Sequence, residues 1–193
     1  MKMELRFRKD RDRSRKYGAA MKAIGGWVLR IAVVCVLAFG VVWYLGQWRS
    51  VVGDSMNPVL HNGDIILVNQ IVYDASNPKR GDVIVFKPDG NEDLHVYMKR
   101  IVGLPGETIQ IKDGKLYIDG KELEEEYKTT VIEDAGVAAE EIKLKKDEYF
   151  VLGDNRMASE DSRSQKVGNV KKTDIEGKVW FVISPKEHVG FLK

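Results

Sequence analysis

The chain has few of the residues that build disulfides, metal sites and histidine-based catalysis. Its 193 residues include one cysteine, Cys35, and three histidines, His61, His95 and His188. Cys35 falls within an apolar run, which disfavours a disulfide framework, a thiol nucleophile and a Cys/His metal site. None of the histidines lies in a motif that marks a general base, and no internal repeat or metal-spaced cluster is present. We therefore expect neither a metal nor a cofactor.

Positive charge is concentrated at the N-terminus. Residues 1–22 carry nine Lys and Arg against three Asp and Glu, a net charge of +6, whereas the whole chain carries +2. No base-reading motif accompanies this basic head, so nucleic acid is not an expected partner. Because basic residues beside a membrane span stay on the cytoplasmic side, we expect residues 1–22 to be cytoplasmic.

An apolar segment follows the basic head and is long enough to cross a lipid bilayer. From Trp27 to Trp48 only Arg30 and Gln47 are polar, and about 22 helical residues span about 33 Å. We expect residues 23–48 to be a single transmembrane helix in the cell membrane, with residues 49–193 outside the cell. A cleavable signal peptide is the alternative, but residues 45–49 offer no small-x-small cleavage site.

The outer domain is predicted to be mainly β, with an antiparallel sheet. Short apolar runs bounded by Gly, Asp and Asn predict buried strands at residues 64–69, 82–86, 149–152 and 178–183. Residues 108–118 alternate with period two about Asp113-Gly114, which predicts a hairpin. Residues 107–148 as a whole are expected to be a peripheral β excursion. Trp180, Phe181 and Phe191 are expected to pack in the core rather than against the membrane.

Ser55 is the candidate nucleophile and Lys99 the candidate base. A serine hydroxyl needs a partner that takes its proton. Lysine can do this only as a neutral amine, and apolar neighbours such as Val96, Met98 and Ile101 would lower its pKa from about 10.4 by burial. Either fragment alone is typical of an ordinary turn or an exposed strand end. Their occurrence together, behind an apolar segment, favours catalysis.

Four runs in this order resemble the bacterial type I signal peptidases (leader peptidases) of the Gram-positive type. The runs are GDSMNPVL (53–60), GDIILVN (63–69), KRGDVIVF (79–86) with YMKRIVGLPGE (97–107), and GDNRMASEDSR (153–163). Members of this family are membrane-bound Ser/Lys endopeptidases that release secreted preproteins from their signal peptides. The resemblance therefore implies secreted preproteins and the lipid bilayer as partners.

The resemblance also implies a role for each matching residue. Ser55 is the acylated nucleophile and Lys99 the general base. Ser159 orients the Lys99 amine by a hydrogen bond, and the supporting ion pairs are Asp161 with Arg163 and Asp154 with Arg100. The backbone N–H of Ser55 binds the oxyanion, because Gly53 stands where some members carry a serine. Val59 replaces a usual threonine, which we expect to be tolerated.

Substrate preference follows from the family and from the position of Ser55. Family members cleave after small side chains of the Ala-x-Ala type. Shallow apolar pockets for these side chains are expected near Met56 and near a strand at residues 94–98, which carries Leu94, Val96 and Met98. Ser55 is the seventh residue after Trp48, and seven residues reach at most about 25 Å when extended. Ser55 is therefore expected near the outer membrane surface, where the end of a signal peptide emerges.

Two other functions were weighed against this hypothesis. A self-cleaving repressor has a Ser/Lys dyad on a related β fold, but it needs a DNA-binding domain where this chain has an apolar segment. A non-catalytic relative that binds preproteins is expected to lack Ser55 or Lys99, and both are present. We therefore expect a membrane-bound serine endopeptidase that removes N-terminal signal peptides.

Overall fold

The computed structural model describes residue 21 and residues 24–40, 46–88 and 96–192. The chain divides into two compact units, residues 1–44 and 45–193. In the first unit residues 24–40 are helical. Among the described residues, no helix combines the length and the hydropathy that crossing a membrane requires. Most of the predicted basic head, and residues 41–45 of the predicted transmembrane segment, lie outside the described residues.

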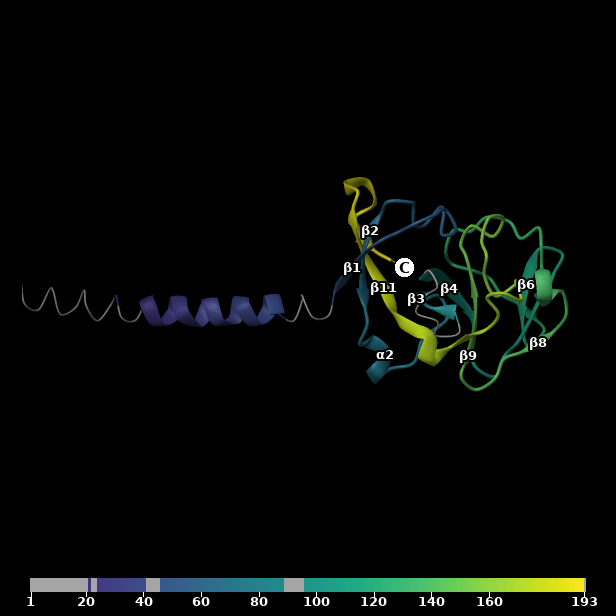
Figure 1. Ribbon diagram of the computed structural model, residues 1–193, viewed down its shortest axis with the longest axis horizontal. Helices are drawn as coiled ribbons and strands as arrows, with labels where there is room; N and C mark the ends of the chain where they lie inside the picture. The colour runs from purple at the N-terminus through teal and green to yellow at the C-terminus, as the bar shows by residue number, and fades with distance from the viewer. Residues whose placement is uncertain (1–20, 22–23, 41–45, 89–95, 193) are drawn as a thin grey trace, which may run out of the picture. The chain divides into compact units, whose positions relative to one another are not determined.

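The second unit is built on an antiparallel sheet of eight strands (Figure 1). Its strands in sheet order are β1 (Gln47–Ser50), β2 (Ile65–Asn69), β11 (Ile175–Ser184), β3 (Val83–Phe86), β4 (Tyr97–Gly103), β9 (Glu148–Leu152) and β10 (Val170–Lys171), and β12 (Gly190–Phe191) pairs with β11. The end of the predicted transmembrane segment therefore needs correction, because Gln47 and Trp48 pair with Val68 and Leu67 in the sheet.

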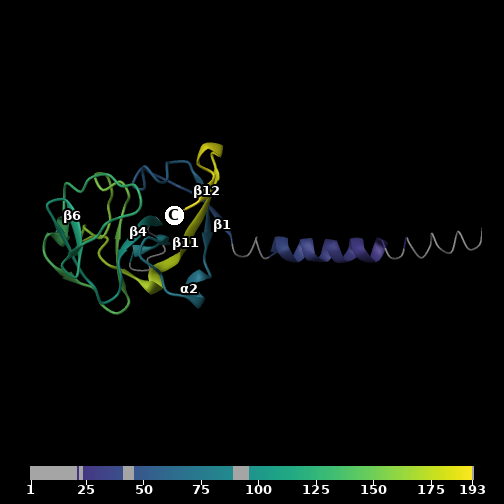
Figure 2. The same cartoon turned by 180° about the vertical axis from the view of Figure 1, so that it is seen from behind.

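A second sheet of four strands forms within the predicted excursion. Its order is β7 (Lys121–Glu122), β6 (Lys115–Ile118), β5 (Thr108–Lys112) and β8 (Ile142–Lys143). Asp113 and Gly114 both have positive φ, 50° and 73°, as a two-residue hairpin turn requires. The predicted hairpin is thus confirmed. Figures 1 and 2 both show β6 at the end of this unit remote from β1.

Short helices connect the strands. They are α2 (Val72–Ala75) and the 3-10 turns η2 (Gly136–Ala139), η3 (Lys172–Asp174) and η4 (Lys186–His188). All four residues of β3 and all five of β9 are buried, as expected of strands covered on both faces. The mainly β, antiparallel fold predicted from the apolar runs is confirmed.

The outer face of the β1, β2, β11 and β12 strands carries a row of large apolar side chains that are half-buried at its centre and exposed at its ends. Register places Trp48 opposite Leu67, Leu67 opposite Phe181, and Phe181 opposite Phe191; we call these four residues the aromatic row. Trp48 is 70% exposed and Phe191 74% exposed. The predicted core position of Phe191 is therefore wrong. The predicted core position of Trp180 is also wrong, because that side chain is exposed as well.

The physical reason is the irregularity of β11, whose register against β2 shifts between Val179 and Phe181 and again between Val182 and Ser184, so that the alternation of faces along the strand is interrupted. Val179 and Val182 of β11 fill the core side, with exposures of 1% and 4%. Phe181 lies between them on the other face, in an edge-to-face contact with Phe191 whose ring centroids are 5.1 Å apart. Core packing is thus supplied by the smaller β-branched residues.

Candidate active site

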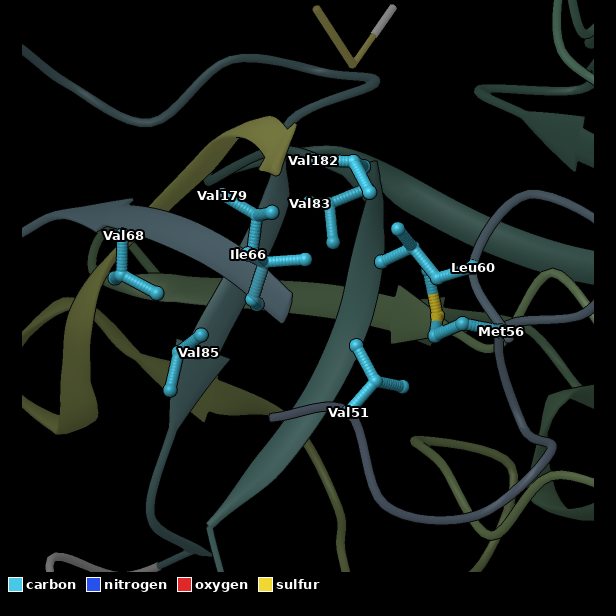
Figure 3. Packing of buried hydrophobic residues seen from close by; sticks show 9 residues of the cluster. All are labelled: Val51, Met56, Leu60, Ile66, Val68, Val83, Val85, Val179 and Val182. Carbon is cyan, nitrogen blue, oxygen red and sulfur yellow. The ribbon is translucent and has the colours of Figure 1, made fainter. Parts of the chain in front are cut away.

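Ser55 lies on the loop that joins β1 to β2, and buried side chains hold this loop in place. Met56 and Leu60 are 1% and 0% exposed and pack with Val51 in the core (Figure 3). The N–H groups of Val59 and Leu60 both donate to the carbonyl of Met56. This tight turn, fixed from below by Met56, leaves the Ser55 side chain half-buried at the surface.

Lys99 is carried by β4 and reaches Ser55 from the middle of the sheet. Its Nζ lies 2.8 Å from Ser55 Oγ, and the residue is only 3% exposed. Burial lowers the pKa of Lys99 to about 8, although the nearby carboxylates of Asp161, Glu160 and Asp154 act in the opposite direction. A substantial fraction of this amine is therefore neutral at mildly alkaline pH and able to accept the hydroxyl proton.

The two predicted ion pairs are both formed and both buried. Arg100 donates to both carboxylate oxygens of Asp154, at 2.8 and 2.7 Å, and both residues are fully buried. Arg163 donates to both oxygens of Asp161 at 2.9 Å. Asp161 Oδ2 also accepts the N–H of Gly153 at 3.0 Å. These pairs fix the backbone of residues 153–163 beside the dyad.

The hydrogen bond predicted from Ser159 to Lys99 is not formed. Among the described residues, Ser159 Oγ is buried and has no hydrogen-bond partner, whereas the Lys99 amine contacts Ser55. The Ser159 hydroxyl packs instead over Gly153, where an added Cβ would lie 2.2 Å from it. The predicted hydrogen bond is therefore wrong, and the Lys99 amine is hydrogen-bonded to Ser55 Oγ.

Gly153 and Asn155 contact the backbone carbonyl of Ser55 directly, although neither residue was predicted to have a role. A Cβ on Gly153 would lie 2.4 Å from the Ser55 carbonyl oxygen, so only glycine fits there. Asn155 donates its backbone N–H to the same oxygen at 3.1 Å and its side-chain amide to the Asp54 carbonyl at 3.1 Å. Their place in the GDNR run beside Asp154 was the available signal.

A cavity of about 610 Å³ opens over the Ser55 and Lys99 side chains. Of the predicted substrate-binding residues, Met56, Val96 and Met98 line it, whereas Leu94 lies outside the described residues. Gly53, Ala158 and Glu160 complete the wall near the dyad. No histidine is present among the described residues that line this cavity. Lys99 is the basic side chain that lies within hydrogen-bond distance of Ser55 Oγ.

Comparison with known proteins gives the family. The sequence matches the family model described as "Signal peptidase, peptidase S26" over residues 24–184. It is 37% identical to signal peptidase I P of Bacillus subtilis subsp. natto over 174 residues, which cover 86% of this chain and 92% of that protein. It is 33% identical to signal peptidase IB of Staphylococcus aureus (strain COL) over 179 residues, 85% of this chain and 91% of that protein.

A crystal structure of a signal peptidase I from Enterococcus faecalis is 34% identical and matches 56% of this chain and 98% of that chain, with a TM-score of 0.42. The family match over residues 24–184 and the two sequence relatives confirm the resemblance seen in the four runs. The chain belongs to the signal peptidase family, peptidase family S26, whose members are serine peptidases.

Proposed function

We propose that the chain is a membrane-bound serine endopeptidase that removes N-terminal signal peptides from secreted preproteins, with Ser55 as nucleophile and Lys99 as general base. The observation that carries this proposal is the buried Lys99 amine, 2.8 Å from the Ser55 hydroxyl, at the wall of the 610 Å³ cavity. A serine beside a neutral amine has the two groups that acyl transfer needs, a nucleophile and a base within hydrogen-bond reach.

In the proposed reaction Ser55 Oγ attacks the carbonyl carbon before the cleavage site while Lys99 Nζ takes the hydroxyl proton. Backbone N–H groups, chiefly that of Ser55, stabilise the negative oxygen of the tetrahedral intermediate. Lys99 then gives its proton to the leaving amine as the C–N bond breaks, leaving an ester on Ser55. Water, deprotonated by the same lysine, hydrolyses this ester and restores the free serine.

The ion pairs are proposed to act through the backbone rather than on the substrate. Asp161, held by Arg163, accepts the N–H of Gly153, and Gly153 lies against the Ser55 carbonyl. Arg100 and Asp154 bind each other on the strand and turn that flank Lys99 and Gly153. Both pairs would thus keep the serine and the lysine in register.

The cavity supports a preference for small side chains before the scissile bond. Its floor is built from Met56, which is almost fully buried, and its wall includes Val96 and Met98. These apolar side chains favour apolar groups of the substrate, and the preference for alanine-sized groups is what the resemblance to the family implies. We propose that the first and third residues before the cleavage site occupy it.

The aromatic row supports the lipid bilayer as a partner. Trp48 and Phe191 expose most of their surface on the sheet whose first strand begins at Gln47, directly after the apolar segment. Tryptophan and other aromatic side chains favour the interface between lipid and water. We propose that the apolar segment crosses the cell membrane once, with the N-terminus cytoplasmic and the peptidase domain outside.

Cleavage of a preprotein in detergent tests this function. The full chain, Ser55→Ala and Lys99→Ala are compared, with Lys112→Ala as a control at an exposed lysine, and the new N-terminus of the product is sequenced. We expect one cut after a small residue by the full chain and the control, and no cut by the other two variants. Cleavage that persists in Ser55→Ala or Lys99→Ala would place the active site elsewhere, and an inactive full chain would favour a preprotein-binding role.

A further inference from the structure

One segment of the excursion, residues 125–130, leaves the second sheet and contacts the turn formed by residues 153–157, beside Ser55. Thr130 donates its N–H to the carbonyl of Asp154 at 3.0 Å, and its hydroxyl accepts the N–H of Met157 at 3.3 Å. Glu125 forms an ion pair with Arg156, whose Nε donates to the carbonyl of Gly153 at 3.0 Å. The segment is thus bonded to both ends of the turn formed by residues 153–157.

Tyr127 lies at the centre of this segment and covers the buried Arg100. The Arg100 guanidinium carbon is 4.0 Å from the centroid of the Tyr127 ring, a distance at which the ring face attracts the cation. The Tyr127 hydroxyl donates to Glu125 Oε1 at 2.7 Å. Burial raises the pKa of Tyr127, so this hydroxyl keeps the proton that it donates.

The position of Arg100 makes this contact relevant to the dyad. Arg100 follows Lys99 on β4, and successive side chains of a strand point to opposite faces. Lys99 therefore faces Ser55 while Arg100 faces the other side, where it binds Asp154 with two hydrogen bonds and Gly81 with a third. Tyr127 closes this site from outside.

The turn formed by residues 153–157 connects the Arg100 and Asp154 pair to the backbone of Ser55. Asn155 donates its N–H to the Ser55 carbonyl oxygen at 3.1 Å, and Gly153 packs directly against that oxygen. A continuous set of contacts thus runs from Tyr127 through Arg100 and Asp154 to the backbone of Ser55. A shift of about 1 Å at a reacting group is enough to cost a large factor in rate.

We propose that Tyr127, with Glu125, is a positioning residue for catalysis: the 125–130 segment clamps the 153–157 turn and thereby holds the Ser55 backbone in register with Lys99. This inference rests on the proposed function for its kinetic consequence. It assigns the excursion a role in the chemical step rather than in substrate contact, since neither Tyr127 nor Glu125 lines the cavity over the dyad.

The test compares the full chain with Tyr127→Ala, Tyr127→Phe and Glu125→Gln. Tyr117→Ala is the matched control, because Tyr117 lies on β6 of the same excursion, opposite Gln110 and Glu122. For each, kcat and KM for a preprotein are measured in detergent together with the thermal unfolding midpoint. Hydrogen exchange of the amides of residues 153–157 and of β11 is followed without substrate.

We expect Tyr127→Ala to lower kcat about tenfold or more with KM changed less than about twofold, as loss of positioning alone requires. Tyr127→Phe keeps the ring over Arg100 and should retain kcat within about threefold, and Glu125→Gln should lower kcat about threefold or more. Tyr117→Ala should leave kcat unchanged. Exchange in residues 153–157 should accelerate in Tyr127→Ala while that of β11 stays the same.

Three results would overturn the inference. The first is a kcat equal to that of the unmodified chain in both Tyr127→Ala and Glu125→Gln. The second is a loss of kcat in Tyr117→Ala as large as that in Tyr127→Ala. The third is a loss of kcat in Tyr127→Ala that is no larger than the unfolded fraction of that variant explains. If Tyr127→Ala does not fold, Glu125→Gln decides alone. If the unmodified chain cleaves no preprotein, the proposed function fails. In that case hydrogen exchange still tests the contact between residues 125–130 and residues 153–157, and amide exchange of residues 153–157 that is unchanged in the variants would contradict it.

Discussion

At the scale of single residues, the site places a lysine where its charge is costly. Lys99 is 3% exposed, and burial moves its pKa from 10.5 to about 8. A fall of that size corresponds to about 3 kcal/mol of unfavourable interaction for the charged amine in the folded state. A lysine that loses its proton near pH 8 has the pKa that the proposed role as a base requires.

The free-energy cost of burying the charged Lys99 amine predicts that Lys99→Met stabilises the folded protein while abolishing cleavage. Because the folded pKa lies below the unfolded one, the unfolded chain binds more protons between about pH 8 and 10.5, and stability rises with pH across that window. At pH 7 the penalty is complete, so the variant should gain up to about 3 kcal/mol there and little above pH 10.5.

Denaturant unfolding at pH 7 and pH 10.5 measures this gain. Lys112→Met, at an exposed lysine on β5, is the control and should gain nothing comparable. Equal stability of Lys99→Met and the unmodified chain at pH 7 would contradict the assigned burial penalty.

At the scale of structural elements, the close approach of the β9 turn to the Ser55 loop determines the geometry of the dyad. Gly153 follows β9 and lies against both the Ser55 carbonyl and the Ser159 side chain. The Ser55 carbonyl oxygen is held by the N–H of Asn155, and Gly153 is held by its own N–H, which donates to Asp161 Oδ2. The Ser55 loop and the turn after β9, about a hundred residues apart in sequence, can thus approach this closely because Gly153 has no Cβ.

Gly153→Ala should therefore lower kcat by about a hundredfold or more and destabilise the domain by about 1–3 kcal/mol, as overpacking typically does. Gly190→Ala on β12 is the control, since a Cβ there meets nothing within 4 Å. Preprotein cleavage and thermal unfolding of the two variants give both numbers. A Gly153→Ala protein with normal kcat would show that the Ser55 loop can shift without consequence.

The sequence predicted the elements whose pattern is local. Strands β2, β3 and β9 are continuous apolar runs, and the β5–β6 hairpin has both alternation and an Asp-Gly turn. Strand β4 was expected near residues 94–98 but occupies Tyr97–Gly103, because Lys99 and Arg100 interrupt its apolar pattern. The charged residues of the candidate site, Lys99 and Arg100, are thus the ones that obscure the strand in the sequence.

Pairings that depend on the tertiary structure could not be predicted in this way. The contacts of Tyr127 with Arg100 and of Asn155 with Ser55 join segments far apart in sequence, and no local pattern marks them. Ser55 and Lys99 could be singled out from the residues as candidate nucleophile and base, and the resemblance to a family supported this choice and added the supporting residues. Among these additions is the Ser159 hydrogen bond that the structure does not contain.

At the scale of the whole molecule, the aromatic row predicts that the peptidase domain touches lipid. The β1 strand that carries Trp48 begins directly after the apolar segment, and the row extends across β2 and β11 to Phe191. Trp48 is 70% exposed and Phe191 is 74% exposed. An apolar row with two side chains exposed to this extent is uncommon on a surface that meets only water.

Quenching of tryptophan fluorescence by brominated lipid tests this contact. A Trp27→Phe, Trp43→Phe variant of the full chain in vesicles retains only Trp48 and Trp180 as reporters. We expect brominated phospholipid to quench their emission by about half, because interfacial indoles lie near the upper acyl carbons. Further replacement of Trp48 should remove much of the quenched signal. Emission that is the same with and without bromine would contradict the lipid contact.

The central claim is that the neutral amine of Lys99 activates Ser55, and the pH dependence of preprotein cleavage tests it most directly. Since only the neutral amine accepts a proton, kcat/KM should rise about tenfold per pH unit up to about pH 8 and then level off. The same midpoint should appear when the Lys99 side chain is titrated by NMR. A profile that stays flat from pH 6 to 9, or a Lys99 that titrates near 10.5 in the folded protein, would contradict the account.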